Sequence, residues 1–252
     1  MKDFQGTRLK RTPAIFVKTF IVTLTLLIIT LLGACAPEPK AEIAAFGDSV
    51  TWGYGALPEG WVIRLQNRTG YEFANLGVPG ERAPAGADRI IAALRTAPNA
   101  GTVIVLHGGN DWVSIFRGSP CLSSCKPEAE EPEYERVAES LRVIRSRIHS
   151  EKRKVVFATY WPGVEASCPQ YRSDQFVLYQ MHLNYLNGKI RTVASEHQDA
   201  VVDLWDLSQI SADQDNYFDC LHPSGKGYDM VTDRWMQDIK LWEPKSGWSV
   251  EF

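Results

Sequence analysis

Three segments of this 252-residue chain carry residue types that could perform acyl transfer together. A serine ends Gly47-Asp48-Ser49, an asparagine follows two glycines in Gly108-Gly109-Asn110-Asp111, and Asp219-Cys220-Leu221-His222-Pro223 places a carboxylate three residues before an imidazole. A serine hydroxyl is a weak nucleophile unless a base takes its proton, a carboxylate orients that base, and hydrogen-bond donors meet the oxyanion that forms. The chain contains a candidate for each of these roles.

Each segment alone has an ordinary structural explanation. Glycine, aspartate, serine and asparagine all favour turns, so the first two segments could be simple turns. Asp219 and His222 could lie in a solvated turn that caps a helix, because Pro223 suits the first turn of a helix. The functional interpretation therefore depends on where these segments fall relative to the strands.

Short apolar segments of strand character alternate along the chain with segments of helical period. Five strands are predicted, at Ile43–Phe46, Glu72–Leu76, Val103–His107, Lys154–Thr159 and Ala200–Leu204. Continuous apolar strands are typical of a parallel sheet that is buried on both faces. Apolar residues recur every three to four positions in two helical stripes, Tyr134-Val137-Leu141-Ile144-Ile148 and Val231-Trp235-Ile239. This alternation predicts an α/β fold, a three-layer doubly wound sandwich with a five-stranded parallel sheet.

The candidate segments follow the predicted strands. In an open parallel sheet, the loops at the carboxyl ends of the strands converge on one crevice, where ligands bind. Ser49 follows the first strand, the glycines of Asn75-Leu76-Gly77-Val78-Pro79-Gly80 follow the second, and Asn110 follows the third. Asp219 and His222 come after the fifth strand. We therefore expect all of them to gather at one edge of the sheet.

Four segments in this order resemble the sequence blocks of the SGNH hydrolases, also called the GDSL esterase/lipase family. The blocks are FGDSVTWGYG, NLGVPG, GGND and DCLHP, and they cover essentially the whole mature chain. The first block departs from the family pattern at Val50, where leucine is usual. The resemblance implies the flavodoxin-like SGNH hydrolase fold and a serine esterase that uses neither a metal nor a cofactor.

The resemblance also implies a role for individual residues. Ser49 would be the nucleophile, His222 the general base and Asp219 the carboxylate that orients it. The oxyanion would be bound by the backbone N–H groups of Ser49 and Gly80 and by the side-chain amide of Asn110. Gly77 competes with Gly80 for this role, but the family pattern places the donor at the later glycine. The remaining histidines are expected to be structural or solvated; they are His107, His149, His182 and His197.

Several aromatic residues follow the predicted strand ends and are candidates for the walls of a substrate pocket. Aromatic side chains stack on sugar rings and shelter alkyl chains, although they also anchor loops. The candidates are Trp52, Tyr54, Trp112, Phe116 and Trp161.

The first 34 residues resemble the signal peptide of a bacterial lipoprotein. A basic start precedes an apolar core over residues 19–32, and Leu32-Gly33-Ala34-Cys35 closes it with small residues and a cysteine. The resemblance implies lipidation of Cys35, a tether over residues 35–41 and a hydrolase domain over residues 42–252. An uncleaved membrane anchor is the alternative, but this core is shorter than the roughly 20 apolar residues that span a bilayer.

Charge and processing together suggest where the protein acts. Without residues 1–35 the chain has 22 basic and 29 acidic residues, a formal net charge of −7, which does not favour a nucleic-acid partner. We expect a lipid-anchored protein of the bacterial cell envelope that faces the periplasm or the exterior. Ala36, rather than aspartate, after the cysteine favours the outer membrane if the source is Gram-negative.

Four cysteines remain in the mature chain, and an oxidising compartment favours disulfides. Three pairings are possible. We favour Cys121 with Cys125, and Cys168 with Cys220, which would tie the His222 loop to the loop after the fourth strand. A zinc site is a weaker alternative, because no second cysteine pair or nearby histidine has ligand spacing. A thiol nucleophile at Cys220 is another, less favoured alternative.

The sequence therefore predicts a serine esterase that cleaves carboxylic esters of a small molecule or a glycan through an acyl-enzyme. Two other functions are compatible with the fold. One is an O-acetyl esterase or acetyltransferase that acts on a polysaccharide, and the other is an envelope lipoprotein that uses the fold only as a binding module.

Overall fold

The computed structural model describes residues 41–119 and 125–244. The predicted signal peptide, Cys35, most of the tether and Cys121 lie outside the described residues. In the part of the chain that is described, no helix is both long and apolar enough to cross a membrane.

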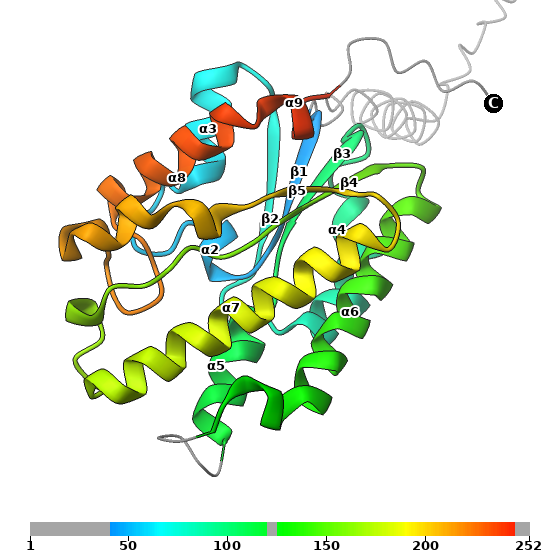
Figure 1. Cartoon of the computed structure of the whole chain (residues 1–252). Helices are drawn as coiled ribbons and strands as arrows, with labels where there is room; N and C mark the ends of the chain where they lie inside the picture. Colours follow the sequence, from blue (N-terminus) through cyan, green and yellow to red (C-terminus); the bar gives the residue numbers. More distant parts are fainter. Residues whose placement is uncertain (1–40, 120–124, 245–252) are drawn as a thin grey trace, which may run out of the picture. The chain divides into compact units, whose positions relative to one another are not determined.

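A five-stranded parallel sheet forms the centre of the fold (Figure 1). Its strands are β1 (Ile43–Gly47), β2 (Phe73–Gly77), β3 (Thr102–Leu106), β4 (Lys154–Ala158) and β5 (Ala200–Val202), in the spatial order β2-β1-β3-β4-β5. Every neighbouring pair is parallel, so the predicted doubly wound sheet is confirmed. From β1 the chain adds β2 on one side and then β3, β4 and β5 on the other, so the strand order switches between β1 and β3. Ligands bind at such a switch point.

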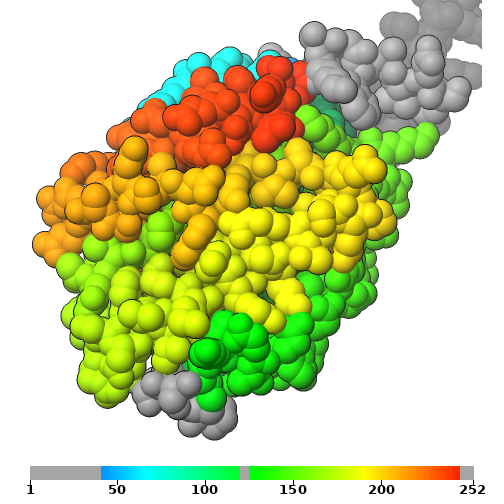
Figure 2. Space-filling model, viewed as in Figure 1, coloured from blue at the N-terminus to red at the C-terminus, as the bar shows by residue number. Residues whose placement is uncertain are grey.

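Helices cover both faces of the sheet. The α-helices among the described residues are α2 (Ser49–Trp52), α3 (Trp61–Thr69), α4 (Ala83–Leu94), α5 (Gly109–Gly118), α6 (Glu131–Ser150), α7 (Ser173–Ser195), α8 (Gly225–Gln237) and α9 (Ile239–Trp242). Helices α3 and α8 pack together on one face, where Trp61 and Trp235 stack with ring centroids 5.0 Å apart. Helices α4, α6 and α7 cover the other face, and α7 runs across the front of the molecule in Figure 2, coloured yellow.

The predicted core residues are buried, because the central strands contact helices on both sides. All five residues of β1 and of β3 are buried. The predicted stripe from Tyr134 to Ile148 forms the buried face of α6. The second stripe is interrupted, since α8 ends at Gln237 and Ile239 begins the separate helix α9.

The two last strands are shorter than predicted. Strand β4 stops at Ala158 and β5 at Val202, because polar side chains take over the backbone hydrogen bonds beyond them. The Thr159 hydroxyl donates to Asp203 over 2.6 Å and accepts from the backbone N–H of Leu204 over 2.8 Å. Asp203 also caps a short 3₁₀ helix, Leu204–Asp206, that replaces the predicted end of the strand.

Candidate active site

Ser49 is the first residue of α2, directly after β1. The Asp48 side chain caps this helix by accepting the backbone N–H of Val50 over 3.0 Å. The helix is only one turn long and ends at Gly53, whose φ of 97° favours glycine. The turn leaves the Ser49 side chain at the carboxyl edge of the sheet, with 6% of the residue exposed.

Ser49, His222 and Asp219 form a continuous chain of hydrogen bonds. The Ser49 Oγ lies 2.7 Å from His222 Nε2, and His222 Nδ1 lies 2.8 Å from Asp219 Oδ2. Asp219 Oδ1 also accepts the backbone N–H groups of Leu221 and His222, each over 2.8 Å. The structure thus brings together three residues that lie on two loops far apart in the sequence.

Hydrogen bonds keep the Asp219 carboxylate ionised. Partial burial by itself raises the pKa of Asp219, but the hydrogen bonds from the His222 side chain and from two backbone N–H groups outweigh that effect. The pKa of this carboxyl therefore lies below its usual value. An ionised Asp219 requires His222 to carry its proton on Nδ1, which leaves Nε2 free to accept the proton of Ser49.

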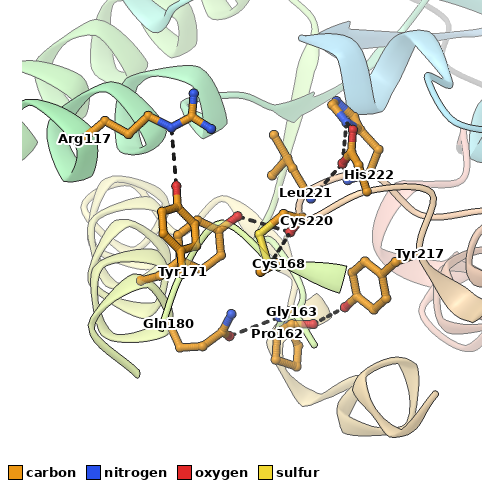
Figure 3. The surroundings of a disulfide bond; sticks show 12 residues. Arg117, Pro162, Gly163, Cys168, Tyr171, Gln180, Tyr217, Cys220, Leu221 and His222 are labelled. Carbon is orange, nitrogen blue, oxygen red and sulfur yellow. Dashed lines mark hydrogen bonds and ion pairs between the residues drawn. A yellow bond between two sulfur atoms is a disulfide. The ribbon is translucent and has the colours of Figure 1, made fainter. Parts of the chain in front are cut away.

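The loop that carries His222 is held at several points (Figure 3). A disulfide joins Cys220 to Cys168 in the β4–α7 connection, as favoured from the sequence. The Tyr179 hydroxyl donates to the carbonyl of Cys220 over 3.1 Å, and the Tyr217 hydroxyl donates to the carbonyl of Pro162. The predicted partner of Cys125, Cys121, lies outside the described residues. The imidazole is therefore presented from a cross-linked loop.

Two of the expected oxyanion donors, Ser49 and Asn110, lie in the first turns of α2 and α5, and the third, Gly80, lies in the loop between β2 and α4. Among the described contacts, the backbone N–H groups of Ser49 and Gly80 donate to no protein acceptor. Asn110 Nδ2 donates one proton to the carbonyl of Glu81 over 3.0 Å, so the Asn110 loop is bonded to the residue that follows Gly80. Gly80 has a φ of 77°, in the left-handed region that favours glycine.

The structure also separates the two competing glycines. The Gly77 N–H donates to Asn75 Oδ1 over 3.0 Å, so it is already engaged. A Cβ at Gly77 would lie 2.3 Å from the backbone nitrogen of Trp52, so this glycine allows β2 to approach α2. Gly80, which has a free N–H, is the better donor candidate.

An ionic cluster behind Asn110 was not anticipated from the sequence. His107 is buried and its Nε2 lies 3.1 Å from Glu81, which also binds Arg89 through two hydrogen bonds. Burial alone would raise the pKa of Glu81, but Arg89 and His107 lower it to about 2. No spacing rule links these residues in the sequence, because they come from three different elements.

The expected pocket aromatics divide into two groups. Trp52 and Tyr54 are more than 40% exposed, and the Tyr54 ring lies 4.6 Å from the His222 ring. The other three, Trp112, Phe116 and Trp161, are buried in the core, and none of them lines the groove beside His222. Trp112, for example, packs against Tyr179 at 4.4 Å, because α5 turns inward after Asn110 and directs its apolar face toward α7.

A groove of about 530 Å³ opens beside the His222 imidazole. Asn110 and His222 line it, so an ester whose carbonyl lies between them would place one of its substituents in this groove. Its other walls come from α5, from the β4–α7 connection and from the His222 loop, and include Arg117, Gln170, Tyr171 and Phe218. The lining is therefore partly aromatic and partly polar.

Comparison with known families agrees with this geometry. The model of the GDSL-like Lipase/Acylhydrolase family matches residues 45–230. The chain belongs to the GDSL-like lipase/acylhydrolase family. This GDSL-like acylhydrolase is therefore a carboxylic ester hydrolase by family, and the matched region includes all four of its sequence blocks. No curated protein sequence matches it.

Solved structures show the same fold for this GDSL-like acylhydrolase. The acetyl xylan esterase AlAXEase is 17% identical, with a TM-score of 0.59, over 78% of this chain and 98% of that chain. The lipase/acylhydrolase from Enterococcus faecalis is 21% identical, with a TM-score of 0.57, over 82% of this chain and 100% of that chain. The esterase EstA from Pseudoalteromonas sp., whose structure was determined with monoethylphosphonate as inhibitor, is 18% identical, with a TM-score of 0.57, over 79% and 96% of the two chains.

Proposed function

We propose that this protein is a serine esterase in which Ser49, His222 and Asp219 form the catalytic triad. The observation that carries the proposal is the hydrogen-bond chain from Ser49 Oγ through His222 to Asp219, with distances of 2.7 and 2.8 Å. These distances fall in the range that proton transfer between a nucleophile and its base requires.

The reaction follows from this arrangement. Ser49 Oγ attacks the ester carbonyl while His222 Nε2 takes its proton, and the tetrahedral intermediate then expels the alcohol, which receives that proton from His222. Water attacks the resulting acyl-enzyme with His222 again as the base. The acid then leaves and Ser49 Oγ recovers its proton. Asp219 stabilises the imidazolium in both steps.

The oxyanion would be bound by the N–H groups of Ser49 and Gly80 and by Asn110 Nδ2. This assignment is supported by the two unengaged N–H groups and by the bond that ties Asn110 to Glu81. A complete set of nucleophile, base and donors also argues against a protein that keeps the fold only as a binding module.

The substrate would be a small-molecule or glycan ester. The groove beside His222 combines aromatic walls with hydrogen-bonding groups, which suits a sugar or another polar body better than a long alkyl chain. The structural neighbour described as an acetyl xylan esterase acts on an ester of this kind, and removal of O-acetyl groups from a polysaccharide is therefore the second candidate activity.

We also propose that the enzyme works in the bacterial cell envelope, anchored by a lipid on Cys35. The support is the basic, apolar and small-residue pattern of residues 1–35. In membrane fractionation of expressing cells, Cys35→Ser should move the protein out of the lipid-bound fraction or leave its signal peptide uncleaved. Unchanged processing and partitioning would rule out lipidation.

A panel of esters tests the activity. The purified protein and Ser49→Ala would be compared on 4-nitrophenyl acetate, butyrate and longer esters and on acetylated xylan, with release of nitrophenol or acetate measured. We expect hydrolysis that depends on Ser49, with a preference for short acyl groups. Equal rates for the two proteins would contradict the proposal, as would no hydrolysis of any ester.

A further inference from the structure

A tyrosine outside the lining of the groove joins the starts of α2 and α5, the two helices that carry Ser49 and Asn110. Tyr160 follows the end of β4 by two residues and is 1% exposed. Its hydroxyl donates to Asp48 Oδ2 over 2.8 Å and accepts the backbone N–H of Gly109 over 2.9 Å. Both hydrogen-bonding functions of the hydroxyl are thus used, one on each loop.

The two partners of Tyr160 lie directly beside the proposed oxyanion donors. Asp48 precedes Ser49, and its other carboxylate oxygen accepts the N–H of Val50, so the carboxylate fixes the backbone on both sides of the nucleophile. Gly109 precedes Asn110. The hydroxyl of Tyr160 therefore links the residue before Ser49 to the residue before Asn110.

The junction has little freedom to move. Asn187 binds both the backbone N–H and the carbonyl of Tyr160, each over 2.8 Å, and holds the tyrosine from α7. A Cβ on Gly109 would lie 2.9 Å from the Tyr160 hydroxyl and 3.0 Å from Asp48 Oδ2. The three groups are in close contact, and only glycine fits at position 109 without displacing one of them.

We infer that Tyr160 is a positioning residue for the proposed esterase, which holds the Asn110 loop against the Ser49 loop so that the oxyanion donors keep their spacing. This inference rests on the proposed function. Donors must be placed before the charge develops, and a misplacement of about 1 Å can cost two orders of magnitude in rate.

The test is Tyr160→Phe, which keeps the ring and removes the hydroxyl. We expect kcat for a 4-nitrophenyl ester to fall roughly 10-fold with KM little changed, because the donors act mainly in the transition state. In an Asn110→Ala background the same substitution should cost less than about 2-fold, since the donor that Tyr160 positions is already gone. Tyr134→Phe is the matched control, because it removes another buried hydroxyl, which is bonded to His182 and to none of the proposed catalytic residues.

Two results would overturn the inference. One is a folded Tyr160→Phe protein with kcat within 2-fold of the parent, and the other is an equal loss in both backgrounds. If Tyr160→Phe does not fold, Gly109→Ala disturbs the same junction and should lower kcat while leaving KM unchanged; full activity in that variant would also overturn the inference. Failure of the proposed function is distinguishable, because Ser49→Ala would then be as active as the parent.

A second observation concerns the charge of the substrate. Arg117 is the sole arginine or lysine among the residues that line the groove beside His222. Its Nε donates to the Tyr171 hydroxyl over 3.3 Å, which leaves both terminal nitrogens of the guanidinium available, and within the described residues no carboxylate pairs with it. The other charged group in the lining, Asp219, is already bonded to His222.

Arg117 is exposed, and Tyr171 supports it on one side. Tyr171 packs edge-on against Phe116 at 5.4 Å and lies three residues after the disulfide-bonded Cys168. Figure 3 shows Arg117 beside Tyr171, with Leu221 between the guanidinium and His222. Arg117 and the proposed base His222 thus line the same groove, with Leu221 between them.

We propose that Arg117 selects esters that carry a carboxylate on the part lying in this groove; this too rests on the proposed function. A guanidinium whose two terminal nitrogens are free can bind a carboxylate in bidentate fashion through that end. The position also predicts that neutral esters are accepted, since Arg117 takes no part in the chemical step.

Matched ester pairs test this selectivity. On the acyl side, mono(4-nitrophenyl) glutarate is compared with 4-nitrophenyl pentanoate; on the leaving-group side, 3-acetoxybenzoate is compared with its methyl ester. In at least one pair, Arg117→Gln should lower kcat/KM for the anionic ester roughly 10-fold and change the neutral ester less than 2-fold. Arg172→Gln changes an exposed arginine at the end of the β4–α7 connection that pairs with Asp174, and it should change neither.

An unchanged preference in both pairs, or an equal loss on anionic and neutral esters, would overturn the role of Arg117. Loss of the proposed function would give a different result, in which the parent protein hydrolyses none of the four esters.

Discussion

At the scale of single residues, the site depends on which groups are already engaged and which are free. The Asp219 carboxylate accepts hydrogen bonds from His222 Nδ1 and from two backbone N–H groups, which hold it beside the imidazole. The N–H groups of Ser49 and Gly80 have no acceptor among the described contacts. An oxyanion that forms at the nucleophile would accept hydrogen bonds from such free donors.

Asn110 provides the sharpest prediction at this scale. Asn110→Ala should lower kcat by on the order of 10² to 10³ with a small change in KM, because the side chain would bind the oxyanion rather than the ground-state ester. Steady-state kinetics with a 4-nitrophenyl ester measure this. Asn184→Ala, on the exposed side of α7, is the control; equal activity of the two variants would exclude Asn110 from the oxyanion site.

The nucleophile, the base and its aspartate could be predicted as residues because they occur in short motifs at strand ends. Tyr160, Glu81 and Arg117 could not, since each acts through a contact with a distant segment that no local pattern encodes. The burial of Trp112 and Trp161 was missed for a related reason. An aromatic residue after a strand can turn toward solvent or toward the core, and the helix packed beside it decides which.

At the scale of elements, the loop between β2 and α4 is fixed by charge. Glu81 binds Arg89 and His107 and offers its carbonyl to Asn110. Since the folded pKa of Glu81 is about 2 and its usual value is 4.5, the unfolded chain binds the proton more readily. The stabilisation is therefore present above about pH 4.5 and is lost as the pH falls toward 2.

Glu81→Gln tests this linkage. Its free energy of unfolding, measured in urea, should be lower than that of the parent at pH 6, and the difference should shrink between about pH 4.5 and pH 2. Glu128→Gln, at an exposed position, should follow the parent curve. A pH-independent difference for Glu81→Gln would mean that its charge does not stabilise the fold.

The alternation of apolar segments predicted the order of strands and helices, and the parallel sheet is confirmed. It did not predict where each element ends, because hydrogen bonds from side chains determine the ends. Thr159 and Asp203 end β4 and β5 by accepting the backbone N–H groups of Leu204 and Trp205. Such competition between side chain and backbone depends on geometry that the sequence pattern does not contain.

At the scale of the whole molecule, the Cys168–Cys220 disulfide closes a loop of 52 residues and joins the β4–α7 connection to the His222 loop. The double variant Cys168→Ala/Cys220→Ala should lose about 2–4 kcal/mol of unfolding free energy, because the unfolded chain regains the freedom of that loop. Denaturant unfolding with and without a reducing agent measures this. The reductant should lower the stability of the parent by more than that of the double variant, and equal stability of the two proteins without reductant would contradict a structural role for the bond.

The central claim is that Ser49 is the nucleophile of an esterase, and covalent labelling tests it most directly. The parent protein and Ser49→Ala would be treated with a fluorophosphonate, and the modified residue would be mapped by mass spectrometry of the digested protein while ester hydrolysis is followed. We predict a single phosphonylated residue, Ser49, with loss of activity in proportion to labelling and no labelling of Ser49→Ala. Labelling at another residue, or full activity after Ser49 is modified, would contradict the account.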